Sequence, residues 1–387
     1  MSSADTGQVV GRDPATGDLL TVRVEGGRIA RVDAQATDDD GPEPYVSAGL
    51  VDLQVNGFAG FDANAAEGGP DLIVAMVRAL VAVGVTTVVP TVVTQSEDHI
   101  VGCLRRIAAA RTVDPLVRQA VPFVHVEGPH LSPDDGPRGV HPLEHIRPPD
   151  VGEFERWQRA CDGLIGIATL SPHWPDSPAY ISALADRGVR VSVGHTHADR
   201  TQISAAADAG ASLCTHLGNG AHAVLPRHPN YVWAQLAEDR LAAGFIGDGH
   251  HLPADTMIAM LRAKGLSRSF LVSDATTLAG AAPGVYRTPV GGEVELSEDG
   301  RLSQRGTPYL AGAARSLTDG VAQVANLGPF SLAAAVSLAT ASPGRVAGGG
   351  RGTLAVGAPA DLVRFHWSPG QQTLRIEDVL VAGRPVA

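Results

Sequence analysis

Short apolar runs rich in β-branched residues recur through the middle of the chain and alternate with helical patterns. Helices are expected between most of these runs, for instance at residues 71–83, 99–110, 177–186 and 254–263. The runs number eight, at residues 51–56, 85–93, 121–126, 164–170, 189–194, 211–215, 241–247 and 269–273. This α/β alternation predicts a (β/α)8 TIM-type barrel. A doubly wound open sheet is the alternative, although no GxGxxG motif follows an early strand.

Two neighbouring runs each end in a histidine. One ends at His195 and the next at His216, and the alanine-rich segment 199–210 between them is expected to form a helix that begins after Asp199 and stops at Gly210. Strand, helix and strand make the βαβ unit of a parallel sheet, in which both strand tips lie at the same edge. The two imidazoles are therefore expected to meet on one metal ion.

Strand patterns also occupy both ends of the chain. Residues 8–33 alternate as a hairpin does, and β character returns near the C-terminus. Neither end can bury a face alone, so together they are expected to form a small β-sandwich. The predicted domains are 1–47 and 351–387, the two parts of that sandwich, and 48–350, the barrel. Further expected elements are a surface connector at 34–44, an exposed hairpin at 286–301 and helices at 316–325 and 332–341.

Composition and net charge bear on which molecules the protein is expected to bind. The chain of 387 residues is 44% apolar, enough for a sizeable core, and its net charge of -11 carries no basic stripe. Nucleic acid and anionic membranes are therefore not expected partners. No run of 18 apolar residues occurs, and residues 1–21 lack the pattern of a signal peptide, so a soluble cytoplasmic protein is expected. The three widely spaced cysteines predict buried reduced thiols rather than a disulfide or zinc knuckle.

Acidic, amide and imidazole side chains follow most of the predicted strands. A lone histidine is more often a hydrogen-bonded surface or core residue than a catalytic one, and Asp274 alone could cap a helix. In barrel enzymes, however, the active site lies at the carboxyl ends of the strands, so the shared position favours a functional site. The residues concerned are Gln54, Asn56, His125, Glu127, His195, His216, Asp248, His250, His251 and Asp274.

Glu127, His195 and His216 form a carboxylate and imidazole set suited to one divalent metal ion, with Zn²⁺ expected first and Fe²⁺ or another divalent ion as alternatives. A metal there would lower the pKa of water toward ~7 and polarise a carbonyl. Asp274 would move the proton from the water to the leaving nitrogen. This set predicts hydrolysis of an amide without a covalent intermediate. A serine hydrolase is disfavoured, because no GxSxG motif is present.

Six short motifs occur in order along the chain. They are Ala-Gly-Leu-Val-Asp-Leu-Gln-Val-Asn-Gly at 48–57, His-Val-Glu-Gly-Pro at 125–129, Gly-His-Thr at 194–196, Thr-His-Leu at 215–217, Asp-Gly-His-His at 248–251 and Ser-Asp-Ala at 273–275. Through these motifs the chain resembles the N-acetylglucosamine-6-phosphate deacetylase family of the amidohydrolase superfamily over roughly residues 48–363. The closing segment from Gly352 to Leu362 resembles that superfamily's return to its β-sandwich.

The resemblance implies deacetylation of an amino-sugar phosphate, with metal ligands at Glu127, His195 and His216 and the acid/base at Asp274. It also implies that Gln54 and Asn56 replace a His-x-His pair, so that a single metal is expected. His141 would help to polarise the acetyl carbonyl. The implied substrate-binding residues are His251, Asn219, Gly220, Gly128, Leu310 and Arg227, the last supplied by the second subunit of a homodimer.

The chain departs from the family pattern around the substrate. The segment after Asn219 reads Gly220-Ala221-His222 instead of Ala-Met, His173 follows the fourth strand where the family tends to carry a glutamate, and Ala313 replaces a small hydroxyl residue. Two other functions therefore stay open. One is deacylation of another N-acetylhexosamine or an N-acyl amino acid, and the other is a barrel that has lost catalysis and serves in binding or assembly.

Overall fold

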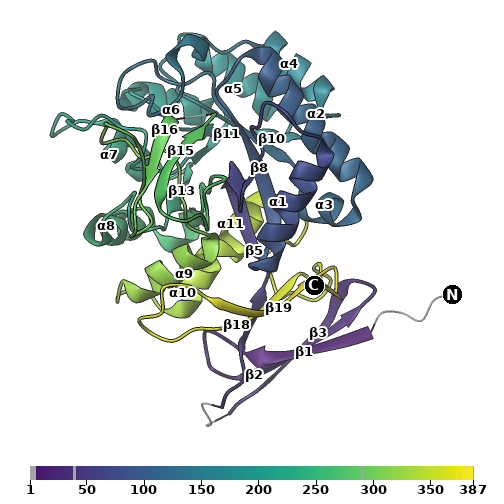
Figure 1. Cartoon of the computed structure of the whole chain (residues 1–387). Coiled ribbons are helices and arrows are strands. Elements are labelled where there is room, and N and C mark those ends of the chain that lie inside the picture. Colours follow the sequence, from purple (N-terminus) through teal and green to yellow (C-terminus); the bar gives the residue numbers. More distant parts are fainter. Residues whose placement is uncertain (1–5, 38–40, 290, 387) are drawn as a thin grey trace.

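The structure is a computed structural model that describes residues 6–37, 41–289 and 291–386. Its centre is a sheet of eight parallel strands, which confirms the predicted (β/α)8 barrel (Figure 1). The seam between the first and last strands is closed by a bridge from Val55 to Ala275 and by a 3.0 Å hydrogen bond from the Asp274 N–H to the Gln54 carbonyl. The strands are β5 (Leu50–Val55), β8 (Val85–Val93), β9 (Val124–Glu127), β10 (Ile165–Leu170), β11 (Arg190–Val193), β12 (Ala211–Cys214), β13 (Ala242–Ile246) and β14 (Ser269–Val272).

Helices cover the outside of the barrel and bury its apolar core. The helix expected at 199–210 is α6, and it begins after Asp199 because that carboxylate and Gln202 form a capping box. The third strand starts at Val124 rather than at the predicted Val121, because a short helix continues to Ala120 and the chain needs the next residues to leave that helix. The helices are α1 (Pro70–Ala82), α2 (Glu97–Val113), α3 (Pro115–Ala120), α4 (Val151–Ala160), α5 (Ser177–Ala185), α6 (Arg200–Asp208), α7 (Tyr231–Ala237), α8 (Ala254–Lys264), α9 (Leu317–Asn326), α10 (Leu332–Ala339) and α11 (Ala341–Ala347).

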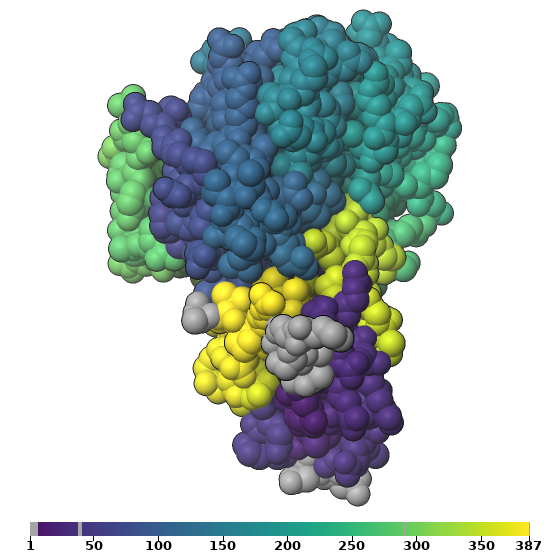
Figure 2. Space-filling view, turned by 90° about the vertical axis from the view of Figure 1, so that its right-hand side faces the viewer, coloured from purple at the N-terminus to yellow at the C-terminus, as the bar shows by residue number. Residues whose placement is uncertain are grey.

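The two ends of the chain share one seven-stranded sheet in a separate lobe. Figure 2 shows the N-terminal residues (purple) and C-terminal residues (yellow) gathered below the barrel. The ends join where β4 pairs with β1 on one side and with β18 on the other. Val22, Ile29, Val46 and Leu362 form part of a separate apolar core there. The order of strands is β20 (Arg384–Pro385), β19 (Arg375–Val381), β18 (Leu362–His366), β4 (Tyr45–Ala48), β1 (Thr6–Arg12), β2 (Leu19–Glu25) and β3 (Arg28–Gln35).

An insertion after the eighth barrel strand adds a small antiparallel sheet. It contains β15 (Gly284–Thr288), β16 (Gly292–Leu296) and β17 (Leu302–Gln304), so the hairpin expected at 286–301 has a third strand. A further short pair is β6 (Gly57–Phe58) with β7 (Phe61–Asp62). The predicted connector at 34–44 includes residues 38–40, which lie outside the described part of the chain. Within the described ranges, none of the helices has both the length and the apolar character needed to cross a bilayer.

Candidate active site

Three of the predicted site residues leave their strands in an unusual backbone conformation. His195, His216 and Asp274 follow β11, β12 and β14, and their φ angles are +47°, +25° and +49°. Residues other than glycine rarely adopt this left-handed region, and such strained positions concentrate at functional sites. All three side chains line the same cavity. The strand ends thus direct these groups toward one another at a local conformational cost.

Glu127, His195 and His216 converge within hydrogen-bonding distance. The Oε1 atom of Glu127 lies 2.9 Å from Nε2 of His216 and 3.3 Å from Nε2 of His195, and the two Nε2 atoms are 3.2 Å apart. All three residues are buried. A carboxylate and two imidazoles brought this close present three lone-pair donors to one point, an arrangement that suits Zn²⁺ and related divalent ions.

The surroundings of these donors fit a metal ion. The Nδ1–H of His195 donates to the Pro137 carbonyl at 2.8 Å, which leaves the Nε2 lone pair directed into the site. Burial raises the pKa of Glu127, but the contacts of its carboxylate with the His195 and His216 imidazoles outweigh burial and hold that pKa well below its usual range. The carboxylate is therefore ionised in a buried setting, where a divalent cation would balance its charge.

His141 lies beside this set on a long loop. Its ring contacts the His195 ring edge-on with centroids 4.5 Å apart, and ligand atoms of Glu127, His141 and His195 lie within 4.8 Å of one another. His216 offers a further ligand atom at the same place, because its Nε2 atom lies 2.9 Å from Oε1 of Glu127. Burial, followed by the neighbouring His195, lowers the pKa of His141 to about 3. A neutral imidazole at this position can donate a hydrogen bond without carrying charge.

Asp274 is held by two amide side chains from the first barrel strand. Its Oδ1 atom accepts hydrogen bonds from Asn56 Nδ2 at 2.7 Å and from Gln54 Nε2 at 3.2 Å. Burial raises the pKa of Asp274 despite the opposing charge of His216. A raised pKa makes a carboxylate a better proton acceptor near neutral pH. From the sequence, Gln54 and Asn56 were expected at a strand end, in place of a His-x-His pair. Their contact with Asp274 was missed, although strands one and eight are neighbours in any closed barrel.

The site opens into a cavity of about 320 Å³, a size within the range of small-molecule sites. His251 lines it and is fixed by Asp248, whose Oδ2 atom lies 2.7 Å from Nδ1 of His251. Threonines, asparagines and glycines supply much of the remaining wall, and the described residues of the lining include no lysine or arginine. The cavity therefore offers many neutral polar contacts but no permanent positive charge from its own chain.

The predicted substrate-binding residues divide into two groups. Asn219, Gly220, His251 and Leu310 line the cavity. Gly128 and Arg227 are not among its lining residues: the first turns the chain after β9, and the second is exposed on the segment before α7.

Gly220 leaves room for a metal ligand. Its φ is +55°, and an added Cβ would lie 2.7 Å from Nδ1 of His195. The chain departs from the family pattern at this position, and a side chain at 220 would clash with the His195 ring.

Several cavity residues were not anticipated from the sequence. Thr276 and Thr277 follow Asp274 directly, so their position after the eighth strand was an available signal. Tyr309 comes from the insertion, and no local pattern indicated its place. No role was predicted from the sequence for His173, His197 or His222. His222 lines the cavity, whereas His173 and His197 contact each other with tilted rings whose centroids are 4.3 Å apart.

A (β/α)8 barrel with buried histidine and glutamate donors, and a further buried carboxylate at the carboxyl ends of its strands, is typical of the class of barrel hydrolases. The chain belongs to the amidohydrolase family, whose model matches residues 45–386. It is 31% identical over 320 residues to the N-acetylglucosamine-6-phosphate deacetylase of Bacillus subtilis, covering 81% of this chain and 79% of the relative.

Two further comparisons bear on the substrate. The chain is 33% identical over 339 residues to the N-acetylgalactosamine-6-phosphate deacetylase of a Shewanella species, covering 87% of this chain and 82% of the relative. It is also similar to an N-acetyl-D-glucosamine-6-phosphate deacetylase variant from Mycobacterium smegmatis solved in complex with N-acetyl-D-glucosamine-6-phosphate. There the TM-score is 0.83 at 28% identity, over 99% of this chain and 97% of the other. These relatives share a reaction on phosphorylated N-acetylhexosamines and differ in the sugar.

Proposed function

We propose that this protein hydrolyses the acetamide of N-acetylglucosamine-6-phosphate to give glucosamine-6-phosphate and acetate. The observation that carries the proposal is the placement of Asp274, a carboxylate of raised pKa, at the same cavity as the converging Glu127, His195 and His216. Named relatives with this activity support it over most of the chain.

The side chains divide the chemistry as follows. Asp274 accepts a proton from the attacking water and delivers it to the departing nitrogen as the carbon–nitrogen bond breaks, so acetate and a free amine leave. The neutral imidazole of His141 donates a hydrogen bond to the acetyl oxygen as negative charge develops there. Glu127, His195 and His216 would hold one divalent ion, Zn²⁺ in this proposal, which supplies Lewis acidity at the carbonyl and lowers the pKa of water.

The test is acetate release from the purified protein. We expect turnover that EDTA abolishes and Zn²⁺ restores, with about one metal ion bound per chain by elemental analysis. The unphosphorylated sugar should be a much poorer substrate. Equal turnover of the two sugars would refute the requirement for phosphate, and absence of turnover after metal loading would refute the proposal and favour a binding or assembly role.

The second candidate is a deacetylase for another N-acylated compound, above all N-acetylgalactosamine-6-phosphate, the 4-epimer of the first substrate. Two observations favour it: the named activity of the Shewanella relative, and the presence of His222 in the cavity wall, where the chain departs from the family pattern. Competition between the two epimers in one assay, with an N-acyl amino acid as a third substrate, distinguishes these functions through their kcat/KM values.

A homodimer is part of the proposal, because the cavity needs a cation for the phosphate. The described lining residues contain no lysine or arginine, whereas Arg227 is exposed and has no hydrogen-bond or ion-pair partner within the described residues. A guanidinium from a second copy would offer paired donors to the phosphate oxygens. A cytoplasmic location is also proposed, since Cys103, Cys161 and Cys214 are all buried free thiols.

Arg227→Ala should raise KM for the phosphorylated sugar by about tenfold or more while kcat changes little, because it removes binding shared by ground and transition states. Turnover of the unphosphorylated sugar should not change. Arg23→Ala, at an exposed position on the terminal sheet, is the matched control. An unchanged KM in the Arg227 variant would show that another group holds the phosphate.

A further inference from the structure

One loop of the barrel, residues 130–147, surrounds the ligand His195. Its Pro137 carbonyl accepts the hydrogen bond from Nδ1 of His195 at 2.8 Å, and its His141 ring packs edge-on against the same imidazole. His141 also lines the cavity. The orientation of a ligand and the position of a carbonyl-polarising group thus depend on the conformation of a single irregular segment.

The two ends of this loop are tied together at a neck formed by Pro129, His130 and Arg147. The Arg147 N–H donates to the Pro129 carbonyl at 3.3 Å, and Nδ1 of His130 lies 3.2 Å from the Arg147 carbonyl. Burial lowers the pKa of His130 to about 4, so its ring is neutral, and Nδ1 carries the proton because a carbonyl can only accept. The neck therefore closes the loop with one backbone–backbone hydrogen bond and one hydrogen bond from a side chain to the backbone.

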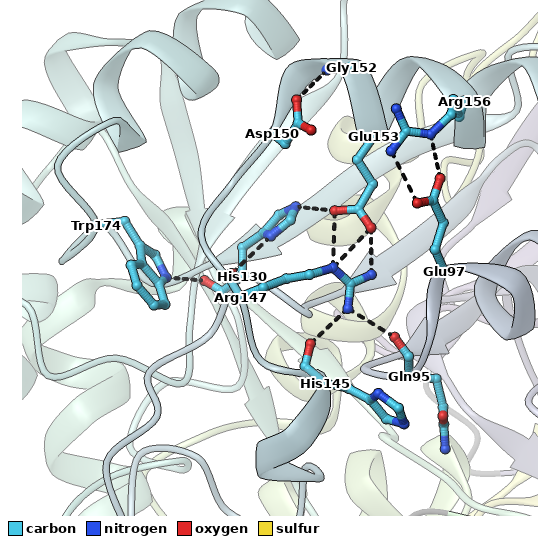
Figure 3. A network of polar contacts seen from close by, with 10 residues as sticks. All are labelled: Gln95, Glu97, His130, His145, Arg147, Asp150, Gly152, Glu153, Arg156 and Trp174. Carbon is cyan, nitrogen blue, oxygen red and sulfur yellow. Dashed lines mark hydrogen bonds and ion pairs between the residues drawn. The ribbon is translucent and has the colours of Figure 1, made fainter.

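A carboxylate outside the loop holds the neck in place. Glu153 on α4 pairs with the Arg147 guanidinium through bonds of 3.0 Å to Nε and 2.5 Å to Nη2, and only 5% of the Glu153 side chain is exposed. The remaining nitrogen of Arg147 donates to the carbonyls of Gln95, at 3.2 Å, and His145, at 2.7 Å. Figure 3 shows Arg147 at the centre of this network. One guanidinium thus joins α4, the loop after β8 and the end of the 130–147 loop.

We propose that Glu153 is a positioning residue: by fixing Arg147 at the neck, it sets the Pro137 carbonyl and the His141 ring around the ligand His195. The expected change in kcat rests on the proposed function, whereas the expected change in metal binding does not. Glu153 is not among the residues that line the cavity, so its effect on the site is transmitted through the loop.

The second half of the 130–147 loop depends on the Glu153–Arg147 pair more than the first half does. The first half is held near the site directly, since the Ser132 N–H donates to the His195 carbonyl at 2.9 Å. Beyond His141 the chain runs through Leu143 and His145 to Arg147 before it enters α4. Removing the buried Glu153 carboxylate leaves the partly buried Arg147 guanidinium without its charged partner, so the neck is the place where this half would loosen.

Glu153→Gln tests the proposal, because the amide keeps the size of the side chain and loses its charge. We expect kcat to fall about tenfold and the Kd for Zn²⁺, measured by chelator competition on the metal-stripped protein, to rise about tenfold, as for groups that orient ligand imidazoles. KM should change little. The control is Glu97→Gln. This substitution breaks an ion pair of 2.5 Å between Glu97 on α2 and Arg156, which lies on α4 like Glu153 but makes this contact outside the loop.

A second variant changes the other member of the pair, Arg147, which belongs to the loop. Arg147→Lys keeps the positive charge but loses the paired geometry, so its kcat and Zn²⁺ Kd should lie between wild type and Glu153→Gln. The proposal is overturned if both variants lower the melting temperature yet retain wild-type kcat and Zn²⁺ Kd at 25 °C, or if Glu97→Gln matches Glu153→Gln. If wild-type protein shows no acetate release, the proposed function fails, and the Zn²⁺ Kd still decides this inference.

Discussion

Replacing Asp274 by asparagine is expected to lower kcat by about 10²–10⁴-fold, the usual contribution of a proton-transferring side chain. The asparagine retains an oxygen that can accept from Asn56 and Gln54, so the local structure should persist. It cannot take a proton from water or return one to the nitrogen. Acetate release under saturating substrate measures the loss, and elemental analysis should find the metal still bound.

Asp71→Asn, at an exposed position in the first turn of α1, is the control for this experiment. It should have wild-type activity. Near-normal turnover in the Asp274 variant would remove this residue from the proposed mechanism. Loss of the metal together with turnover would instead make Asp274 part of the metal site.

Glu127→Gln is expected to abolish metal binding at nanomolar to micromolar concentrations and, with it, turnover. The substitution replaces the ionised carboxylate between His195 and His216 with a neutral amide, which is a poor ligand. Groups that merely orient ligands already change metal affinity about 10–100-fold, and the loss of a ligand itself should exceed that range. Elemental analysis and Zn²⁺ titration of the folded variant measure the effect.

The matched control is Glu67→Gln, at an exposed position before α1, which should retain both metal and activity. Circular dichroism distinguishes loss of metal from loss of fold. A Glu127 variant that binds Zn²⁺ as tightly as wild type would show that the metal is held elsewhere, with His141 and its neighbours as the next candidates.

Much of the barrel followed from local pattern. The eight predicted runs each overlap a strand of the observed sheet, because a buried parallel strand must be apolar over its length and each strand needs a helix to return the chain. Glu127, His195, His216 and Asp274 could also be singled out from the sequence, because all four lie at the ends of predicted strands, and the structure places them around one cavity. The β17 strand and the start of β9 were missed, because short elements depend on neighbours more than on propensity.

The sequence by itself determined the class of fold and the residue types available at one mouth of the barrel, because both depend on periodicity and on position relative to the strands. Only the tertiary structure decided which groups meet: Asn56 and Gln54 on Asp274 across the barrel seam, Pro137 on His195, and Glu153 on Arg147. No local pattern in the sequence indicates these pairs. They form because closing the sheet and burying the helices remove these polar groups from water, so that each must find its hydrogen-bond partners within the protein.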